Sequence, residues 1–171
     1  MIKKKDLQNG FTLIETLIYV AIFSVFMVTI GMFATFIINS RLNNQIIFEI
    51  NDQGNEAMGG ITQSIRNATT VNSPGVSGTA NSLSINTALA STTPTVFSLA
   101  SGVLYIKEGT GSLVPLTNGE ISVTNLIFSN LSQSLKPNTI QIRFTATDLA
   151  TSTRLAGHFT SDFYGSASLR R

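Results

Sequence analysis

The spacing of hydrophobic residues in this chain changes twice along its length. From Thr16 to Ser40 the residues are almost all apolar and none is charged, and about 20 such residues cross the hydrocarbon core of a membrane as a helix. From Arg41 to about Arg66 apolar residues recur mostly every four positions, which predicts a helix with one apolar face. Beyond Ala68 short apolar runs alternate with period two, as strands do. The pattern therefore predicts one long helix, apolar and then amphipathic, followed by a strand-rich head.

The amphipathic half of the helix is expected to lay its apolar face against the head. That face consists of Leu42, Ile46, Ile50, Ala57, Ile61 and Ile65, with Ile47 and Met58 beside it. Each glycine in a helix costs about 1 kcal/mol relative to alanine, so Gly54 and the pair Gly59-Gly60 are candidate positions for a break or bend. The acidic stretch EINDQGNE fits no EF-hand spacing, and a solvated helix face explains it more simply.

The head is expected to be a mostly antiparallel sheet packed on the amphipathic half of the helix, which makes an α+β fold. Its clearest strand is TIQIRFTATD, with Ile140, Ile142, Phe144 and Ala146 facing inward and Thr139, Gln141, Arg143 and Thr145 facing outward. The stretch VLYIKEGTGSLVPLT predicts a hairpin that turns at Gly109 and Gly111.

Two other parts of the head have weaker patterns. EISVTNLIFSNL alternates through Ile121 and Val123 and then drifts toward Leu126 and Phe128. Residues 72–95 are loop-rich, and we interpret them as a decorated loop with an edge strand at Leu83–Ile85.

The formal charge of +2 comes from the first ten residues. Without Lys3, Lys4, Lys5 and Asp6 the chain has eight basic and eight acidic residues, so a nucleic-acid partner, which needs clustered basic charge, is not expected. The lysines precede the apolar run and only Arg41 directly follows it, which predicts a cytoplasmic N-terminus and a head outside. The absence of cysteine excludes disulfides and thiolate metal sites.

Glu15 lies at the start of the apolar run, where an ionised carboxylate costs roughly 2.5–3.5 kcal/mol and usually has a partner. The run supplies no basic residue, but cleavage after Gly10 would create an α-amine on Phe11. That amine could pair with Glu15 of the same chain, one helical turn away, or of a neighbour. Three interpretations compete: a secretory signal peptide, a plain signal anchor and a processed assembly helix. The first lacks an A-x-A cleavage site, and the second explains neither the glycine nor the glutamate.

The stretch KKKDLQNG, followed by FTLIETLIYVAIFSV, resembles the N-terminal signature of type IV prepilins and pseudopilins over about residues 3–34. The resemblance implies that a prepilin peptidase cuts after Gly10 and N-methylates Phe11, and that Glu15 directs assembly with other pilin or pseudopilin subunits. Major pilins often carry a proline within this helix. Here no proline precedes Pro74, so we expect a continuous helix with Gly31 as its soft point.

The order of the head segments, from SIRNATTV to YGSASLRR, is similar to that of J-class minor pseudopilins and W-type minor pilins. The resemblance implies a minor subunit near a filament tip, with an inner-membrane assembly platform among its partners and a single span in the cytoplasmic (inner) membrane. The implied parts are a leader (1–10), a transmembrane and assembly helix (11–40), an amphipathic helix (41–68) and a β-rich head (69–171). Two alternatives stay open: an adhesin or DNA-uptake minor pilin whose head binds a ligand, and an unprocessed bitopic membrane protein.

Candidate chemistry in the head is sparse. The only histidine, His158, has Asp148 and Asp162 near it in sequence, but no G-x-S-x-G elbow accompanies it. GTGS is too short for a phosphate loop. A calcium site, which the resemblance suggests for some major pseudopilin heads, needs several oxygen ligands, to which Asp148 or Asp162 could contribute. We expect no enzyme activity, no cofactor and no metal.

Overall fold

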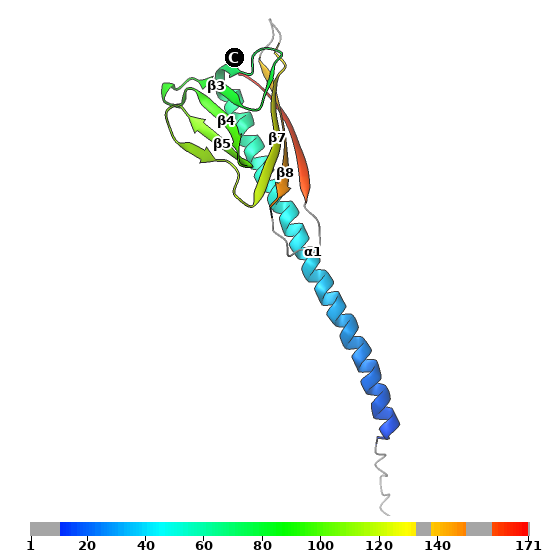
Figure 1. Ribbon diagram of the computed structural model, residues 1–171. Helices are drawn as coiled ribbons and strands as arrows, with labels where there is room; N and C mark the ends of the chain where they lie inside the picture. The colour runs from blue at the N-terminus through cyan, green and yellow to red at the C-terminus, as the bar shows by residue number, and fades with distance from the viewer. Residues whose placement is uncertain (1–10, 133–137, 150–158, 171) are drawn as a thin grey trace, which may run out of the picture. The chain divides into compact units, whose positions relative to one another are not determined.

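The computed structural model describes residues 11–132, 138–149 and 159–170, without the side chains of Leu42 and Asn43. Its described residues form an α+β fold, which confirms the predicted class (Figure 1). The elements are α1 (Leu13–Asn67), β1 (Ala68–Ser73), β2 (Thr79–Ala80), β3 (Leu83–Thr87), the 3-10 helix η1 (Ala90–Thr92), β4 (Thr95–Ala100), β5 (Val103–Glu108), β6 (Leu113–Pro115), β7 (Ile121–Asn130), β8 (Thr139–Asp148) and β9 (Thr160–Ser168). The chain divides into two compact units, residues 1–43 and residues 44–171.

Helix α1 is continuous through all of its glycines. The candidate break at 54–60 is therefore wrong, whereas the expectation of a continuous helix at Gly31 is confirmed. Gly54 has a packing role instead, because a Cβ atom built there would lie 2.1 Å from Cζ of Phe163 on β9. Burial of the apolar face against the head stabilises the helix, which is the usual source of helical stability in proteins.

The predicted apolar face of α1 is buried where the structure describes it. Ile46, Ile50, Ala57, Ile61 and Ile65 are all in the core, whereas Ile47 is exposed and Leu42 lies outside the described side chains. The same core contains residues of both sheets, among them Phe97, Leu104, Phe128 and Phe144. The amphipathic half of α1 is thus the element on which the head is built.

The described strands form two antiparallel sheets. One has the order β1-β3-β4-β5-β6 and the other the order β2-β7-β8-β9. The predicted alternation of β8 is confirmed, since Ile140, Ile142, Phe144 and Ala146 are fully buried while Gln141 and Arg143 are exposed. The predicted hairpin is also present as β5 and β6, with Gly109 at φ +52° in its turn.

The drift in the pattern of β7 has a structural cause. Its pairing with β8 shifts register between Thr124 and Ile127, and Asn125 between them has φ +52°. Such a bulge adds one residue to a strand and turns the following side chains to the opposite face. The buried positions accordingly change from Ile121 and Val123 to Leu126 and Phe128.

The interpretation of residues 72–95 is wrong in one respect. β3 lies between β1 and β4 and is an inner strand, not an edge strand. Its neighbour β1 consists of ATTVNS, a polar sequence with little alternation, so it gave no strand signal. Hydrogen bonds between the side chains of Asn86 and Asn72 (2.7 and 3.2 Å) join β3 to β1 on an exposed face.

Candidate functional site

The first turn of α1 has the spacing of a capping box. Thr12 precedes the helix, its Oγ1 accepts a hydrogen bond from the backbone N–H of Glu15 (3.4 Å), and its carbonyl accepts one from Thr16 N–H (3.2 Å). A threonine followed three residues later by glutamate is a known helix start signal. The carboxylate also lies in the first turn, where the helix dipole favours negative charge. Thr12 therefore caps the start of α1, with Glu15 in the first turn, and the sequence interpretation missed this helix start signal.

The Glu15 carboxylate has one neighbour on the next turn of the helix. The phenol of Tyr19 donates a hydrogen bond to Oε1 of Glu15 (3.2 Å), and its ring makes an edge-on contact with Phe11, with centroids 6.4 Å apart. Phe11, Glu15 and Tyr19 thus follow one face of the chain at four-residue steps. The spacing is visible in the sequence, yet the tyrosine was not predicted as a partner of the glutamate.

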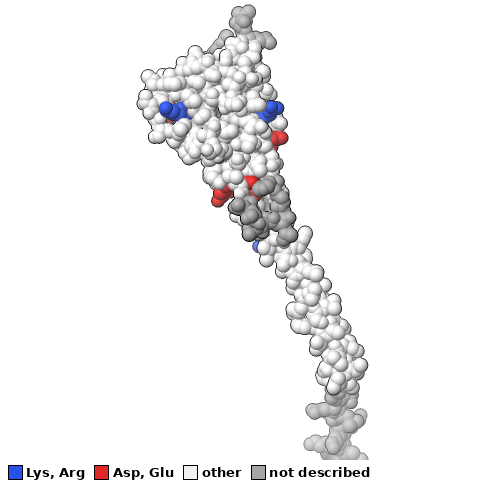
Figure 2. Space-filling model, in the orientation of Figure 1, with Lys and Arg blue, Asp and Glu red and all other residues white. Residues whose placement is uncertain are grey.

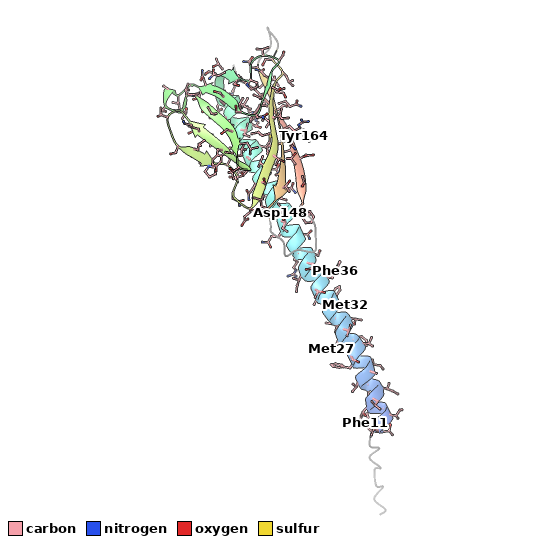
Figure 3. All side chains as sticks on the ribbon, viewed as in Figure 1. Phe11, Met27, Met32, Phe36, Asp148 and Tyr164 are labelled. Carbon is pink, nitrogen blue, oxygen red and sulfur yellow. The ribbon has the colours of Figure 1, made fainter. Side chains whose placement is uncertain are left out.

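The following segment of α1 presents apolar side chains on every side. The residues from Leu13 to Ile38 are exposed almost throughout, and Figure 3 shows Phe11, Met27, Met32 and Phe36 along this half of the helix. A helix that is apolar all round belongs in a membrane or a large core. Among the described residues α1 is the one helix long and apolar enough to cross a membrane.

The hydroxyl groups in this segment are satisfied by their own helix. Ser24 donates to the carbonyls of Val20 (2.9 Å) and Ala21 (2.8 Å), and Thr29 and Thr35 donate to carbonyls three residues earlier (2.8 Å each). Internal bonds of this kind meet the requirement that polar groups in lipid find partners without water. Glu15 is the one charged residue between Phe11 and Ser40. It is therefore the group whose charge most needs a partner there.

Two of the predicted residues lie outside the described part of the chain: His158 of the head and Gly10 of the leader. Oδ1 of Asp162 accepts a hydrogen bond from Thr145 Oγ1 (2.7 Å) on the neighbouring strand. Within the described residues no group of three His, Cys, Asp or Glu side chains could hold a metal ion.

The acidic stretch EINDQGNE of α1 is hydrogen-bonded to the turn of the head that contains Asn118. The side-chain amide of Gln53 bonds to Oε1 of Glu49, and Oε1 of Gln53 accepts the backbone N–H of Asn118 (2.9 Å). The Asn118 side chain also donates to Glu49 (3.3 Å). Gln53 is only 8% exposed, so this polar residue on the apolar face ties α1 to the turn before β7.

One comparison with known proteins produced a match. Residues 5–31 match the family model of the prokaryotic N-terminal methylation motif. A search of curated proteins and a search of solved structures found no match. The matched residues end well before the head, so they support a type IV pilin-like protein through its N-terminal segment alone. The motif implies processing by a prepilin peptidase and assembly with other pilin subunits.

Proposed function

We propose that this chain is a minor subunit of a type IV pilus or type II secretion pseudopilus, positioned near the filament tip. The observation that carries the proposal is the methylation motif at residues 5–31 at the start of an exposed apolar helix. The prepilin is held in the cytoplasmic (inner) membrane with its N-terminus inside and its head outside, in keeping with the lysines before the span. It then enters the filament by packing of its apolar helix against other subunits. Such contacts are heterologous and need not close, so repeated addition makes a fibre.

The role of the first turn follows from its charges. Cleavage between Gly10 and Phe11 places a new amine one helical turn before Glu15, and N-methylation of Phe11 keeps that amine positive. In the membrane, a neighbour's Glu15 is the counter-charge that offsets the cost of burying both groups. Tyr19, bonded to Oε1 at 3.2 Å, leaves the second carboxylate oxygen for this pairing. Glu15 thus sets the axial register between subunits.

The placement near the tip is supported only by the order of the head segments, which is similar to J-class and W-type minor subunits. The described head carries few scattered charges on the face drawn in Figure 2. An adhesin or DNA-uptake role therefore gains no specific support from the structure. The head serves in this proposal as a contact surface for other subunits and for the assembly platform.

The deciding experiment is the intact mass and N-terminal sequence of the chain expressed with and without a prepilin peptidase. We expect a peptidase-dependent start at Phe11 carrying one additional methyl group. A chain that still begins at Met1 in the presence of an active peptidase would replace this proposal with the unprocessed bitopic protein. A known prepilin processed in the same cells serves as the positive control.

A further inference from the structure

Strand β9 has one row of backbone groups that points away from its sheet. At its two ends Asp148 N–H donates to Phe159 O and Leu169 N–H donates to Asn138 O, both at 3.0 Å. Opposed residues of antiparallel strands alternate between hydrogen-bonded and non-bonded pairs, so every odd-numbered residue of β9 bonds to β8. The even-numbered residues direct their N–H and C=O groups to the free edge. They are Thr160, Asp162, Tyr164, Ser166 and Ser168.

Among the described residues, this edge has little of the usual protection against strand pairing. Natural edge strands are short, bulged, or interrupted by lysine or proline. β9 has nine residues, its register with β8 has no shift, and its one charged residue, Asp162, is bonded to Thr145. Tyr164 projects from it with 64% of its surface exposed (Figure 3). In the described part of the chain, the outward backbone groups of 160–168 have no backbone partner.

A positively charged groove continues from this edge. It lies between the C-terminal ends of α1 and β9, which the hydrogen bond from Arg170 N–H to Arg66 O (3.2 Å) joins, and it has a volume of about 650 Å³. Its polar lining consists of Gln63, Arg66, Asn67, Ser166, Ser168 and Arg170, with no acidic residue among the lining residues. Two arginines, Arg66 and Arg170, therefore line the same groove as Ser166 and Ser168 of the outward-facing row.

We propose that β9 accepts an extended segment of a neighbouring filament subunit as an added strand, and that Arg66 and Arg170 hold a carboxylate of that segment. The proposal rests on the proposed function, because it takes the partner to be another subunit. An added strand satisfies the outward N–H and C=O groups of β9. Arginine binds carboxylates through paired hydrogen bonds, which gives the groove a preference for an acidic partner. A nucleic acid would leave the strand edge unsatisfied, and two arginines are few phosphate contacts.

The binding test uses the full-length chain in detergent micelles and synthetic peptides of about nine residues, the length of β9. The peptides are rich in Thr and Val and carry two Asp at either the N-terminal or the C-terminal end. We expect one of them to bind and to protect the outward amides, those of Thr160, Asp162, Tyr164, Ser166 and Ser168, from hydrogen exchange. Two further series of peptides carry N-methyl groups on either the odd-numbered or the even-numbered amides. Only one of these two sets of amides faces β9 in an added strand. N-methylation of that set should abolish binding, and N-methylation of the other set should leave binding unchanged. Equal binding of both N-methylated series, or no binding by any peptide, would overturn strand pairing.

The variants separate charge from backbone pairing. Arg66→Gln with Arg170→Gln should weaken binding of the acidic peptide by roughly tenfold or more, while Arg143→Gln, an exposed arginine outside the groove, should leave it unchanged. Ser166→Pro removes one outward N–H without touching the β8 ladder and should also weaken binding.

Several outcomes refute the proposal. An equal effect of Arg143→Gln would contradict the groove, and so would equally tight binding of inorganic phosphate or a short DNA duplex through the same two arginines. Dimerisation of the chain through β9 would also refute the proposal, because the edge would then bind a second copy of this chain. None of these outcomes bears on processing at Gly10, so a processed chain without peptide binding refutes this inference alone. An unprocessed chain that binds the peptide refutes the filament role instead.

Discussion

For Gly54→Ala, helix propensity predicts a gain in the free energy of unfolding, whereas tertiary packing predicts a loss. Alanine is about 1 kcal/mol more favourable than glycine inside a helix, so the isolated helix would gain stability. In the head, however, the new Cβ would lie 2.1 Å from Cζ of Phe163 and 2.5 Å from both Cε atoms. Carbon atoms in contact are normally about 3.5–4.0 Å apart. The ring would therefore have to move by more than 1 Å.

The surroundings of Phe163 make that movement costly. The ring is only 8% exposed, and it is stacked on Phe144 with centroids 5.0 Å apart and planes at 19°. Overpacking of a buried site typically costs about 1–3 kcal/mol, and a clash of this depth belongs at the upper end. After the gain in helix propensity, we expect Gly54→Ala to lower the free energy of unfolding by about 2 kcal/mol.

The assay is thermal and urea unfolding of the full-length chain in micelles, followed by far-UV circular dichroism. A loss of about 2 kcal/mol corresponds to a fall in Tm of roughly 6–10 °C for a head of this size. Gly59→Ala and Gly60→Ala are matched controls, since nothing lies within 4 Å of their built Cβ atoms, and each should gain about 0.5–1 kcal/mol. Phe163→Leu should partly relieve the defect in the double variant. If Gly54→Ala proves as stable as Gly60→Ala, the close approach of α1 to β9 is refuted.

Two further predictions concern the start of α1 and the loop before β7. Glu15→Ala should insert into the membrane normally but reduce filament yield by about tenfold or more, because the cross-subunit charge pair is lost. A normal filament yield, or an equal loss of yield in the control Ser24→Ala, would contradict the role of Glu15 in setting the register. Gln53→Ala should lower the free energy of unfolding by about 1–2 kcal/mol, because the N–H of Asn118 loses its acceptor. Urea unfolding measures this loss, and the exposed residue Gln63 provides the control, since Gln63→Ala should stay within about 0.5 kcal/mol of the parent. Equal free energies of unfolding for Gln53→Ala and Gln63→Ala would show that the bond to Asn118 is unimportant.

The helix and the clearest strands could be predicted because their patterns are strong and local. The apolar face from Ile46 to Ile65 and the inward residues of β8 were both recognised from period alone, and both are buried. The helix cap at Thr12 was equally local and was missed, although threonine and glutamate have the spacing of a capping box. The sequence interpretation singled out Glu15 as a charge in an apolar run, but its hydrogen bond to Tyr19 was found only in the structure.

Other features depend on residues far apart in sequence. Gly54 resembles a helix breaker until Phe163 of β9 is known to occupy the space beside it. Gln53 appears as a polar interruption of an apolar face, and its partner Asn118 is 65 residues away. β3 becomes an inner strand only because the polar strand β1 pairs with it. No local pattern contains this information, since each residue's role is set by a neighbour from another element.

The amino-acid sequence by itself determined the membrane-length helix, the charge asymmetry around it and the methylation motif. Those features depend on composition and short spacing, because lipid selects apolar residues over about 20 consecutive positions and a processing enzyme acts on a contiguous segment. The tertiary structure alone decided which glycine is a contact, which polar residue is buried and which strand edge is open. These depend on pairing between distant segments, and a one-residue shift in strand register would move every side chain to the other face.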